Sequence, residues 1–444
     1  MKILITNGVA LNTGDAAIIL SIIELLRIQF GQDTEFIIYD PNPNIASKYY
    51  PQLIWRRSIY SQITQPEQKE CLKNSLLDKA WKRIKQSWRY RISLPLFYFA
   101  AWCQVKGLSY ISKLLLNKEQ LQDLYHYSSA DLIVSTGGTY LVEIYSLKPR
   151  IFDYQISLLM QRPLVFYTQS LGPFLDQNNR QILRKIFNES ILILLRDELS
   201  LKNLQELEIS EDKMHLSSDV VFSSKSKMER VNLQPSSNLY LNSQLKIAIS
   251  VRFWQAFKTV SVEIGMNSYR SAMCALTQYL VKKYNAEITY ISTCQGIPEY
   301  WTDDSKLATE IYNLLPNDIQ ERVSVNSNFH TPQTLLEMLT SYDLVIGTRM
   351  HMCILALAGG TPVFPIAYEF KTKELFARLG MSEWVQDIET INEESIIRSL
   401  DDFLVNLPKF RSNLMAQVEQ ERSRAIKSGV LVKESLEKWQ RKSM

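Results

Sequence analysis

Short apolar runs alternate with amphipathic stretches along most of the chain. The pattern predicts strands at residues 2–6, 35–40 and 131–135, and a helix from about Ala16 to Phe30. Apolar strands that alternate with helices are typical of a parallel sheet covered on both faces. A second alternation of the same kind begins at Lys246. We therefore predict an α/β protein with two doubly wound, Rossmann-like parallel sheets that face each other across a cleft.

The same pattern suggests where the domains divide. Residues 1–222 are predicted to form the N-terminal domain, with a helical insertion at about 45–127 where the alternation lapses. Residues 223–244 are polar and aperiodic, which favours a linker. Residues 245–407 are predicted to form the C-terminal domain. A charged helical tail is expected over 408–444, broken at Gly429.

Composition narrows the function classes. The 444 residues carry a formal net charge of only +4, which does not favour nucleic-acid binding. Five cysteines lack C-x-x-C spacing, so we expect reduced thiols in a cytoplasmic protein and no metal site. The first residues, Met-Lys-Ile-Leu-Ile-Thr, lead directly into a strand pattern, so no signal peptide is expected. The most apolar window, residues 94–116, contains Lys106 and Lys113 and is not predicted to span a membrane.

The segment from Asp343 to His351 carries the strongest chemical signal. An apolar strand ends at Gly347-Thr348, and the next helix begins with Arg349 and His351. Ligands of open α/β sheets bind at the carboxyl ends of strands, where helix N-termini favour anions. We predict that Arg349 binds an anionic substrate and that His351 is catalytic.

Other strand ends supply further candidates. Gly14 and Asp15 lie where the first strand turns into the first helix. Thr13 or Asp15 is expected to cap that helix. Alternatively, the Asp15 carboxylate orients or deprotonates a substrate hydroxyl. Gly137 and Gly138 form either a tight turn or a close approach to substrate, in a sequence that is not a phosphate loop. The remaining candidates for substrate binding at strand ends are Gln169, Ser170, Arg252, Glu369 and Lys371.

Several polar residues at strand ends also have purely structural interpretations. Arg196 and Asp197 at a helix start are expected to cap and pair. Glu369 and Lys371 lie at the predicted cleft edge, where solvation alone accounts for them equally well. Arg252 is more informative, because its fork of N–H groups at a strand end suits a carboxylate or phosphate.

Basic and aromatic residues alternate from Lys79 to Arg91 and continue into an apolar stretch that ends near Leu116. Three interpretations stay open for this region: a solvated helix face, a peripheral membrane contact through residues 79–116, and nucleic-acid binding, the least favoured of the three. Replacement of Trp81 and Trp88 with Ser tests the membrane contact.

Six strand-end motifs in this order resemble the polysaccharide pyruvyl transferase family. They are 12–18 (NTGDAAI), Gly137-Gly138, 169–173 (QSLGP), Arg196-Asp197 with Ser200, 219–222 (DVVF), and 347–351 (GTRMH) with 360–362 (GTP). The glycine turn reads Thr-Gly-Gly-Thr rather than three glycines, and the insertion carries no family motif.

The resemblance implies a GT-B-like fold and transfer of the enolpyruvyl group of phosphoenolpyruvate onto two sugar hydroxyls. It implies that Arg349, His351 and Arg252 serve the phosphoenolpyruvate site, with no cofactor and no metal. The acceptor is expected to be a saccharide that is lipid-linked, polymeric or nucleotide-bound. Two other hypotheses remain: a GT-B glycosyltransferase or sugar-nucleotide epimerase that uses a nucleotide sugar, and a non-catalytic saccharide-binding protein.

Overall fold

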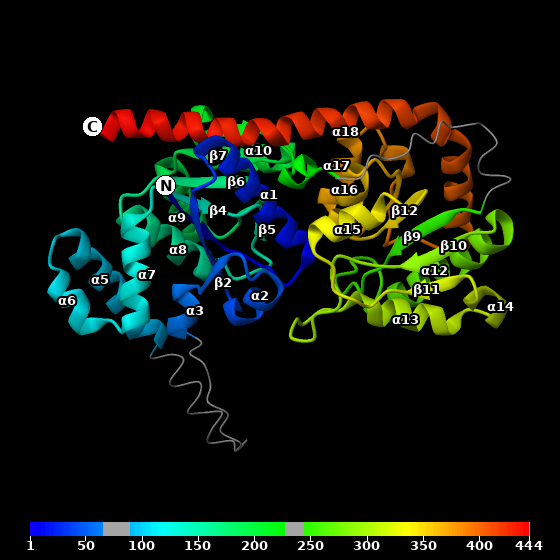
Figure 1. Ribbon diagram of the computed structural model, residues 1–444, viewed down its shortest axis with the longest axis horizontal. Helices are drawn as coiled ribbons and strands as arrows, with labels where there is room; N and C mark the ends of the chain where they lie inside the picture. The colour runs from blue at the N-terminus through cyan, green and yellow to red at the C-terminus, as the bar shows by residue number, and fades with distance from the viewer. Residues whose placement is uncertain (65–88, 227–243, 444) are drawn as a thin grey trace, which may run out of the picture. The chain divides into compact units, whose positions relative to one another are not determined.

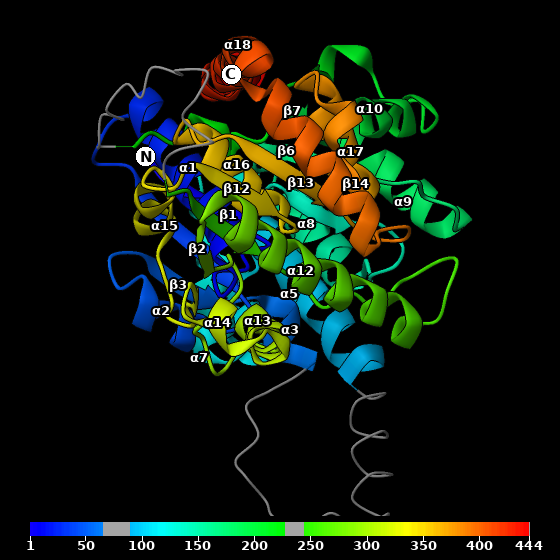
Figure 2. The same ribbon diagram turned by 90° about the vertical axis from the view of Figure 1, so that its right-hand side faces the viewer.

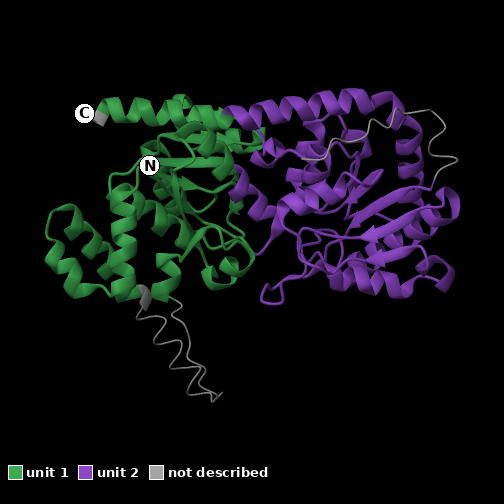
Figure 3. Ribbon diagram, in the orientation of Figure 1, with its two compact units in different colours: residues 1–10, 22–217, 428–444 green, residues 11–21, 218–427 purple. Residues whose placement is uncertain are grey.

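The computed structural model describes residues 1–64, 89–226 and 244–443. Figure 1 shows the labelled helices and strands of the chain, which forms two compact units that Figure 3 draws in green and purple. Unit 1 contains residues 1–10, 22–217 and 428–444, and unit 2 contains residues 11–21 and 218–427. The predicted two-sheet α/β fold is confirmed, because each unit is built on one parallel sheet.

The sheet of unit 1 has the strand order β3-β2-β1-β4-β6-β7-β8, with β5 paired to β6. All of these pairs are parallel. The strands are β1 (Lys2–Thr6), β2 (Glu35–Asp40), β3 (Ile54–Arg57), β4 (Leu132–Ser135), β5 (Gly138–Leu141), β6 (Leu164–Leu171), β7 (Leu192–Leu195) and β8 (Met214–Leu216). The helices between them are α1 (Thr13–Phe30), α2 (Pro43–Tyr49), α3 (Ile59–Thr64), α5 (Leu94–Val105), α6 (Ser109–Leu115), α7 (Lys118–Ser129), α8 (Lys148–Leu159), α9 (Gln177–Glu189) and α10 (Glu198–Gln205).

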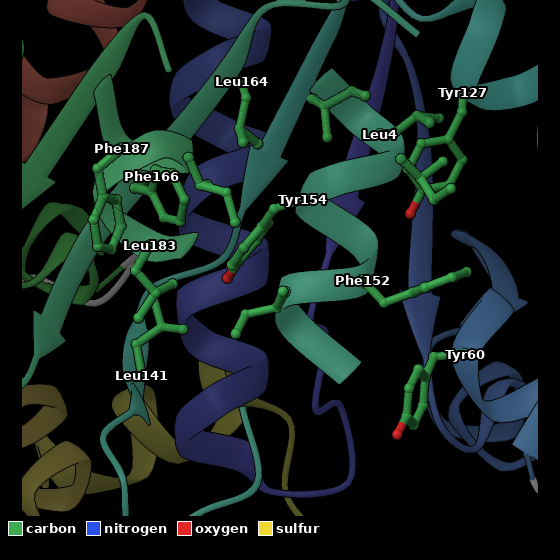
Figure 4. Packing of buried hydrophobic residues seen from close by; sticks show 14 of the residues in the cluster. Leu4, Tyr60, Tyr127, Leu141, Phe152, Tyr154, Leu164, Phe166, Leu183 and Phe187 are labelled. Atoms are coloured by element: carbon green, nitrogen blue, oxygen red, sulfur yellow. The ribbon is translucent and has the colours of Figure 1, made fainter. Parts of the chain in front are cut away.

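Aromatic rings fill the core between this sheet and α8 (Figure 4). Phe166 of β6 packs edge-on against Tyr154 of α8 and Phe187 of α9, with ring centroids 4.9 Å apart in both pairs. Both faces of the central strands are covered, so those strands are apolar throughout rather than alternating.

The sheet of unit 2 has the order β11-β10-β9-β12-β13-β14, again with every pair parallel. Its strands are β9 (Lys246–Ser250), β10 (Glu287–Tyr290), β11 (Val323–Val325), β12 (Leu344–Gly347), β13 (Val363–Ala367) and β14 (Gln386–Asp387). Its helices are α12 (Val262–Tyr284), α13 (Asp304–Leu314), α14 (Asn317–Gln320), α15 (Pro332–Leu339), α16 (Met350–Ala358), α17 (Phe370–Arg378) and most of α18 (Glu393–Ser443).

The strand order of unit 2 reverses between β9 and β12. Right-handed crossovers then place α12 and α13 on one face and α15 and α16 on the other, as seen in Figure 2. Such a switch point is where doubly wound sheets bind ligands, outside the carboxyl ends of the strands. A ligand site is therefore expected beside the residues that follow β9 and β12.

The compact units differ from the expected domains at two places near the site. Residues 11–21 and 218–222 belong to unit 2, although the sequence assigned both to the N-terminal domain. The turn before α1 is bonded to unit 2, because Thr13 N donates to Thr293 O over 2.9 Å and Thr13 Oγ1 donates to His330 O over 3.0 Å. Gly14 and Asp15 consequently share a unit with His351. Most of the expected linker, residues 227–243, lies outside the described residues.

The predicted helical insertion needs a correction. Residues 54–57 form β3, which extends the sheet by parallel pairing with β2. This short edge strand, Ile-Trp-Arg-Arg, has no buried residue, so no apolar run in the sequence predicts it. Residues 79–88 of the basic aromatic segment, with Trp81 and Trp88, lie outside the described residues.

The predicted tail is also wrong in its boundaries. α18 begins at Glu393 and continues through Pro408 and Gly429 without a break. Buried side chains along its inner face hold it in place, and Ser428 Oγ lies 2.8 Å from Tyr167 Oη. Tertiary packing thus outweighs the low helix propensity of proline and glycine.

Across the described ranges, no helix is both long enough and apolar enough to cross a membrane.

Candidate active site

The turn after β12 is held tightly against β9. Thr348 N donates to Ser250 O over 3.0 Å, and Thr348 Oγ1 lies 2.7 Å from Tyr269 Oη of α12. A side chain at Gly347 would lie 2.3 Å from Cys353 Sγ, so this position needs glycine for close packing. The turn therefore presents Arg349 and His351 from a rigid base at the switch point.

Arg349 is paired with a carboxylate that the sequence analysis did not select. Its Nε and Nη2 donate to the two carboxylate oxygens of Asp304, each over 2.7 Å. Burial lowers the pKa of Arg349, but the charge and hydrogen bonds of Asp304 raise it by more, so the guanidinium stays charged. Asp304 therefore fixes the guanidinium plane and neutralises much of its charge.

Arg252 has a different environment. Its guanidinium carbon lies 4.1 Å from the ring centroid of Tyr368 and 5.1 Å from that of Trp254. It forms no ion pair with any residue in the described ranges, and its side chain is half-buried. Contact with two rings holds this cation in place without neutralising it.

Glu369 and Lys371, just beyond β13, form an ion pair of 2.8 Å. Burial alone would raise the pKa of Glu369, but the charges of Lys371, Arg252 and Arg349 bring it below its usual value. Glu369 is consequently ionised near this cationic group. Neither residue is simply solvated, because their side chains are only 21% and 16% exposed.

A cavity of about 360 Å³ opens beside the two arginines. Its lining includes Arg252, Arg349, Asp304 and Lys306 together with the aromatic side chains of Trp254 and Trp301. The lining also contains Asp303 and Glu310, so acidic and basic groups are balanced around the cavity. The arginines beside it can pair with an anionic group of a small ligand.

His351 lies in the first turn of α16, close to an acid from another segment. Its Nε2 is 3.5 Å from Oδ2 of Asp219, which is itself buried. That distance is longer than a formed hydrogen bond, and the buried Nε2 has no hydrogen-bond partner among the described residues. A movement of a few tenths of an ångström would form the bond and orient the imidazole.

Gly14 makes room for this imidazole. A Cβ at Gly14 would lie 2.7 Å from both Cβ and Nδ1 of His351. The first turn of α1 therefore packs directly against the candidate histidine, and the structure brings Gly14 and His351 together as neighbours.

Asp15 lies in the first turn of α1 and is half-exposed. Its charge contributes, after burial, to the raised pKa values of Cys294, at about 12, and of Tyr300. The expected cap at Thr13 is wrong: Asn12 Oδ1 accepts from Gly14 N over 2.9 Å, while the Thr13 hydroxyl bonds to His330. An asparagine is as good a cap as the threonine beside it.

The candidates of unit 1 are built into its interior. Ser170 Oγ donates to Asp197 Oδ2 over 2.6 Å and accepts from Arg196 Nε over 2.7 Å. Asp197 also caps α10 by accepting from Ser200 N over 2.7 Å, which confirms its predicted capping role. Ser170 is 1% exposed, so this network braces the strand end.

Gln169 is likewise buried at the end of β6. Its Nε2 donates to Thr136 O and to Tyr140 Oη, the latter over 3.0 Å. Its Oε1 has no hydrogen-bond partner among the described residues. Gly137 and Gly138 adjoin this cluster, and Gly138 has φ of +144°, which favours glycine. The turn at Gly137-Gly138 and the amide of Gln169 therefore belong to one buried polar cluster within unit 1.

Four residues of the site in unit 2 were missed by sequence reasoning: Asp219, Trp254, Asp304 and Tyr368. Asp219 was noted only as part of a motif, and Asp304 resembles an ordinary acidic residue at a helix start. Their importance depends on contacts with residues 45 to 132 positions away, which no local pattern records.

Two α/β units, each built on one parallel sheet, define a GT-B-like fold, which solved glycosyltransferase and epimerase structures share. Within this fold class the chain belongs to the polysaccharide pyruvyl transferase family, whose model matches residues 12–369. It is accordingly a transferase with a saccharide acceptor.

Among curated proteins the chain is similar to the amylovoran biosynthesis protein AmsJ of Erwinia amylovora, with 25% identity over 429 residues, 95% of this chain and 96% of that protein. Among solved structures it resembles a glycosyltransferase of Rickettsia africae, with TM-score 0.56, 11% identity and coverage of 98% of each chain. The UDP-GlcNAc 2-epimerase of Neisseria meningitidis has TM-score 0.56 and 13% identity, with coverage of 98% of this chain and 100% of the other. These structural likenesses concern the fold alone.

Proposed function

We propose that this transferase moves the enolpyruvyl group of phosphoenolpyruvate onto two hydroxyls of one saccharide, forming a cyclic pyruvate ketal in the biosynthesis of a cell-surface or exopolysaccharide. The supporting observation is the pairing of family membership with a cavity lined by Arg252 and Arg349. The similarity to a protein of amylovoran biosynthesis supports the polysaccharide context.

Phosphoenolpyruvate carries a carboxylate and a phosphate, which two arginines and a helix N-terminus can bind. We assign the larger share of this binding to Arg252, because Asp304 already occupies two donor groups of Arg349. No metal or cofactor is needed in this scheme.

The reaction requires a proton at the methylene carbon of phosphoenolpyruvate and two new bonds from sugar oxygens to its central carbon. The bond from that carbon to the phosphate oxygen breaks, and inorganic phosphate leaves. One hydroxyl proton balances the new methyl group and the other goes to phosphate. In this proposal His351 transfers a proton, Asp219 orients its imidazole, and Asp15 is the candidate base for a hydroxyl.

Calorimetric titration of phosphoenolpyruvate into the wild type, Arg252→Gln and Arg398→Gln tests the donor site, with a UDP-sugar as parallel ligand. Arg398 is an exposed arginine of α18 and serves as the matched control. We expect Arg252→Gln to weaken phosphoenolpyruvate binding by more than about 1.4 kcal/mol, tenfold in affinity. Arg398→Gln should bind like the wild type.

A UDP-sugar signal without phosphoenolpyruvate binding would contradict the proposal and favour glycosyl transfer or epimerisation. Release of inorganic phosphate that depends on both phosphoenolpyruvate and a saccharide would then complete the test. Comparison of nucleotide-bound, lipid-linked and polymeric saccharides in that assay identifies the acceptor.

A further inference from the structure

The outer surface of α5 and α6 in unit 1 exposes large apolar side chains that the candidate site does not use. Exposed fractions reach 48% for Phe99, 40% for Trp102, 61% for Tyr110 and 82% for Leu114. We call these four residues, with Leu96 and Tyr98, the α5–α6 face. Figure 1 shows the two helices at the periphery of unit 1, beside α7.

The inner side of the same helices is well anchored. Phe97 packs against Phe152 of α8 with ring centroids 6.0 Å apart, and Ala100 and Ala101 are fully buried. Ser112 Oγ of α6 donates to Ala100 O over 2.7 Å. The α5–α6 face is consequently presented by a folded hairpin of helices, and its exposure is not a consequence of loose packing.

The chain segment that carries this face has charges of one sign, up to Glu119 at the start of α7. From Arg91 to Lys118 the chain has four basic residues and no acidic one, although acidic and basic residues are nearly balanced in the whole chain. Lys106 and Lys113 are exposed at the end of α5 and within α6. An exposed aromatic surface with lysines at its edge matches the headgroup region of an anionic bilayer.

We propose that the α5–α6 face is a docking surface for an anionic lipid bilayer. The rings of Phe99 and Trp102, which stack with centroids 6.0 Å apart, enter the headgroup boundary, while Lys106 and Lys113 contact lipid phosphates. α5 and α6 are too short to span a bilayer, so the contact is peripheral. A protein partner is less favoured, because lysine is depleted in protein interfaces.

Co-sedimentation of the full chain with vesicles tests this surface, using phosphatidylcholine alone and phosphatidylcholine mixed with phosphatidylglycerol. We expect the wild type to pellet with the anionic vesicles and to be released by raised salt. Lys106→Glu/Lys113→Glu should weaken binding by roughly tenfold or more. Phe99→Ser/Trp102→Ser should also reduce it, with circular dichroism like the wild type.

Two control variants match these changes in chemistry. Val405→Ser removes an exposed apolar residue of α18, and Lys282→Glu reverses an exposed lysine of α12. Both should pellet like the wild type. The lysine pair keeps the test valid if the aromatic pair fails to fold.

Failure of the wild type to bind anionic vesicles would overturn the proposal, as would unchanged binding of both surface variants. A wild-type dimer that becomes monomeric in Phe99→Ser/Trp102→Ser, with vesicle binding unchanged, would assign the face to a second copy of the chain instead. The assay uses neither phosphoenolpyruvate nor saccharide, so its result is independent of the proposed reaction.

Discussion

The carboxyl edges of the two sheets carry similar polar side chains but use them differently. In unit 1, Ser170, Arg196 and Asp197 bond to one another in the interior. In unit 2, Arg252 lies against two aromatic rings beside a cavity, and His351 Nε2 is unbonded among the described residues. The two sheets share the same order about their first strand, so topology does not decide which polar groups remain available for chemistry.

Two arginines of unit 2 also differ in the groups that hold their side chains. Arg349 is bound to a buried carboxylate, whereas Arg252 contacts two aromatic rings and forms no ion pair among the described residues. The first arrangement favours a structural contribution, and the second favours ligand binding. Substitutions can sharpen this contrast, because the two roles predict opposite patterns of stability and affinity.

The largest expected effect is on stability. Asp304→Ala leaves the Arg349 charge buried without its partner, which should lower the free energy of unfolding by about 3 to 5 kcal/mol. Arg252→Gln should change it by less than about 1 kcal/mol. Urea unfolding measures both, and equal losses in the two variants would show that the contrast between the arginines is mistaken.

The second effect is on turnover. His351→Gln should lower kcat for phosphate release by about 100-fold or more, because proton transfer by a positioned side chain typically contributes that much. Asp219→Asn should cost about tenfold by leaving the imidazole poorly oriented. Affinity for phosphoenolpyruvate should stay close to that of the wild type in both. A wild-type kcat for His351→Gln would remove this residue from the mechanism.

The third effect concerns a buried acid of unit 1. Burial raises the pKa of Asp153 from 3.8 to about 7, and its Oδ1 has no hydrogen-bond partner among the described residues. The unfolded chain ionises near 3.8, so Asp153 destabilises the fold increasingly as pH rises toward 7. The advantage of Asp153→Asn over the wild type in unfolding free energy should therefore grow by roughly 2 kcal/mol from about pH 5 to about pH 8. An advantage that is constant with pH would argue against this shift.

The smallest effect tests the interior network of unit 1. Ser170→Ala removes one acceptor for Arg196 and one donor for Asp197, which should lower stability by about 1 kcal/mol. Phosphoenolpyruvate affinity should be unchanged. A loss of affinity without a loss of stability would instead place Ser170 at the substrate, as the sequence predicts.

Local patterns were sufficient for most of the fold. Apolar runs of four to six residues placed β1, β2, β4 and β12 to within a residue, because buried parallel strands must be apolar along their whole length. They failed at β3, whose edge position permits arginines, and at α18, where burial overcomes Pro408 and Gly429. The family follows from spaced motifs, and the match over residues 12–369 confirms it.

The sequence by itself determined the residue types at the strand ends: arginine, histidine and glycine beside β12, and an acid before α1. Only the tertiary structure decided which of them meet. It placed Gly14 against His351, paired Arg349 with Asp304, and enclosed Ser170 in a network. The physical reason is that strand periodicity is encoded by neighbours along the chain, whereas pairing and burial of charge depend on distant segments brought together by folding.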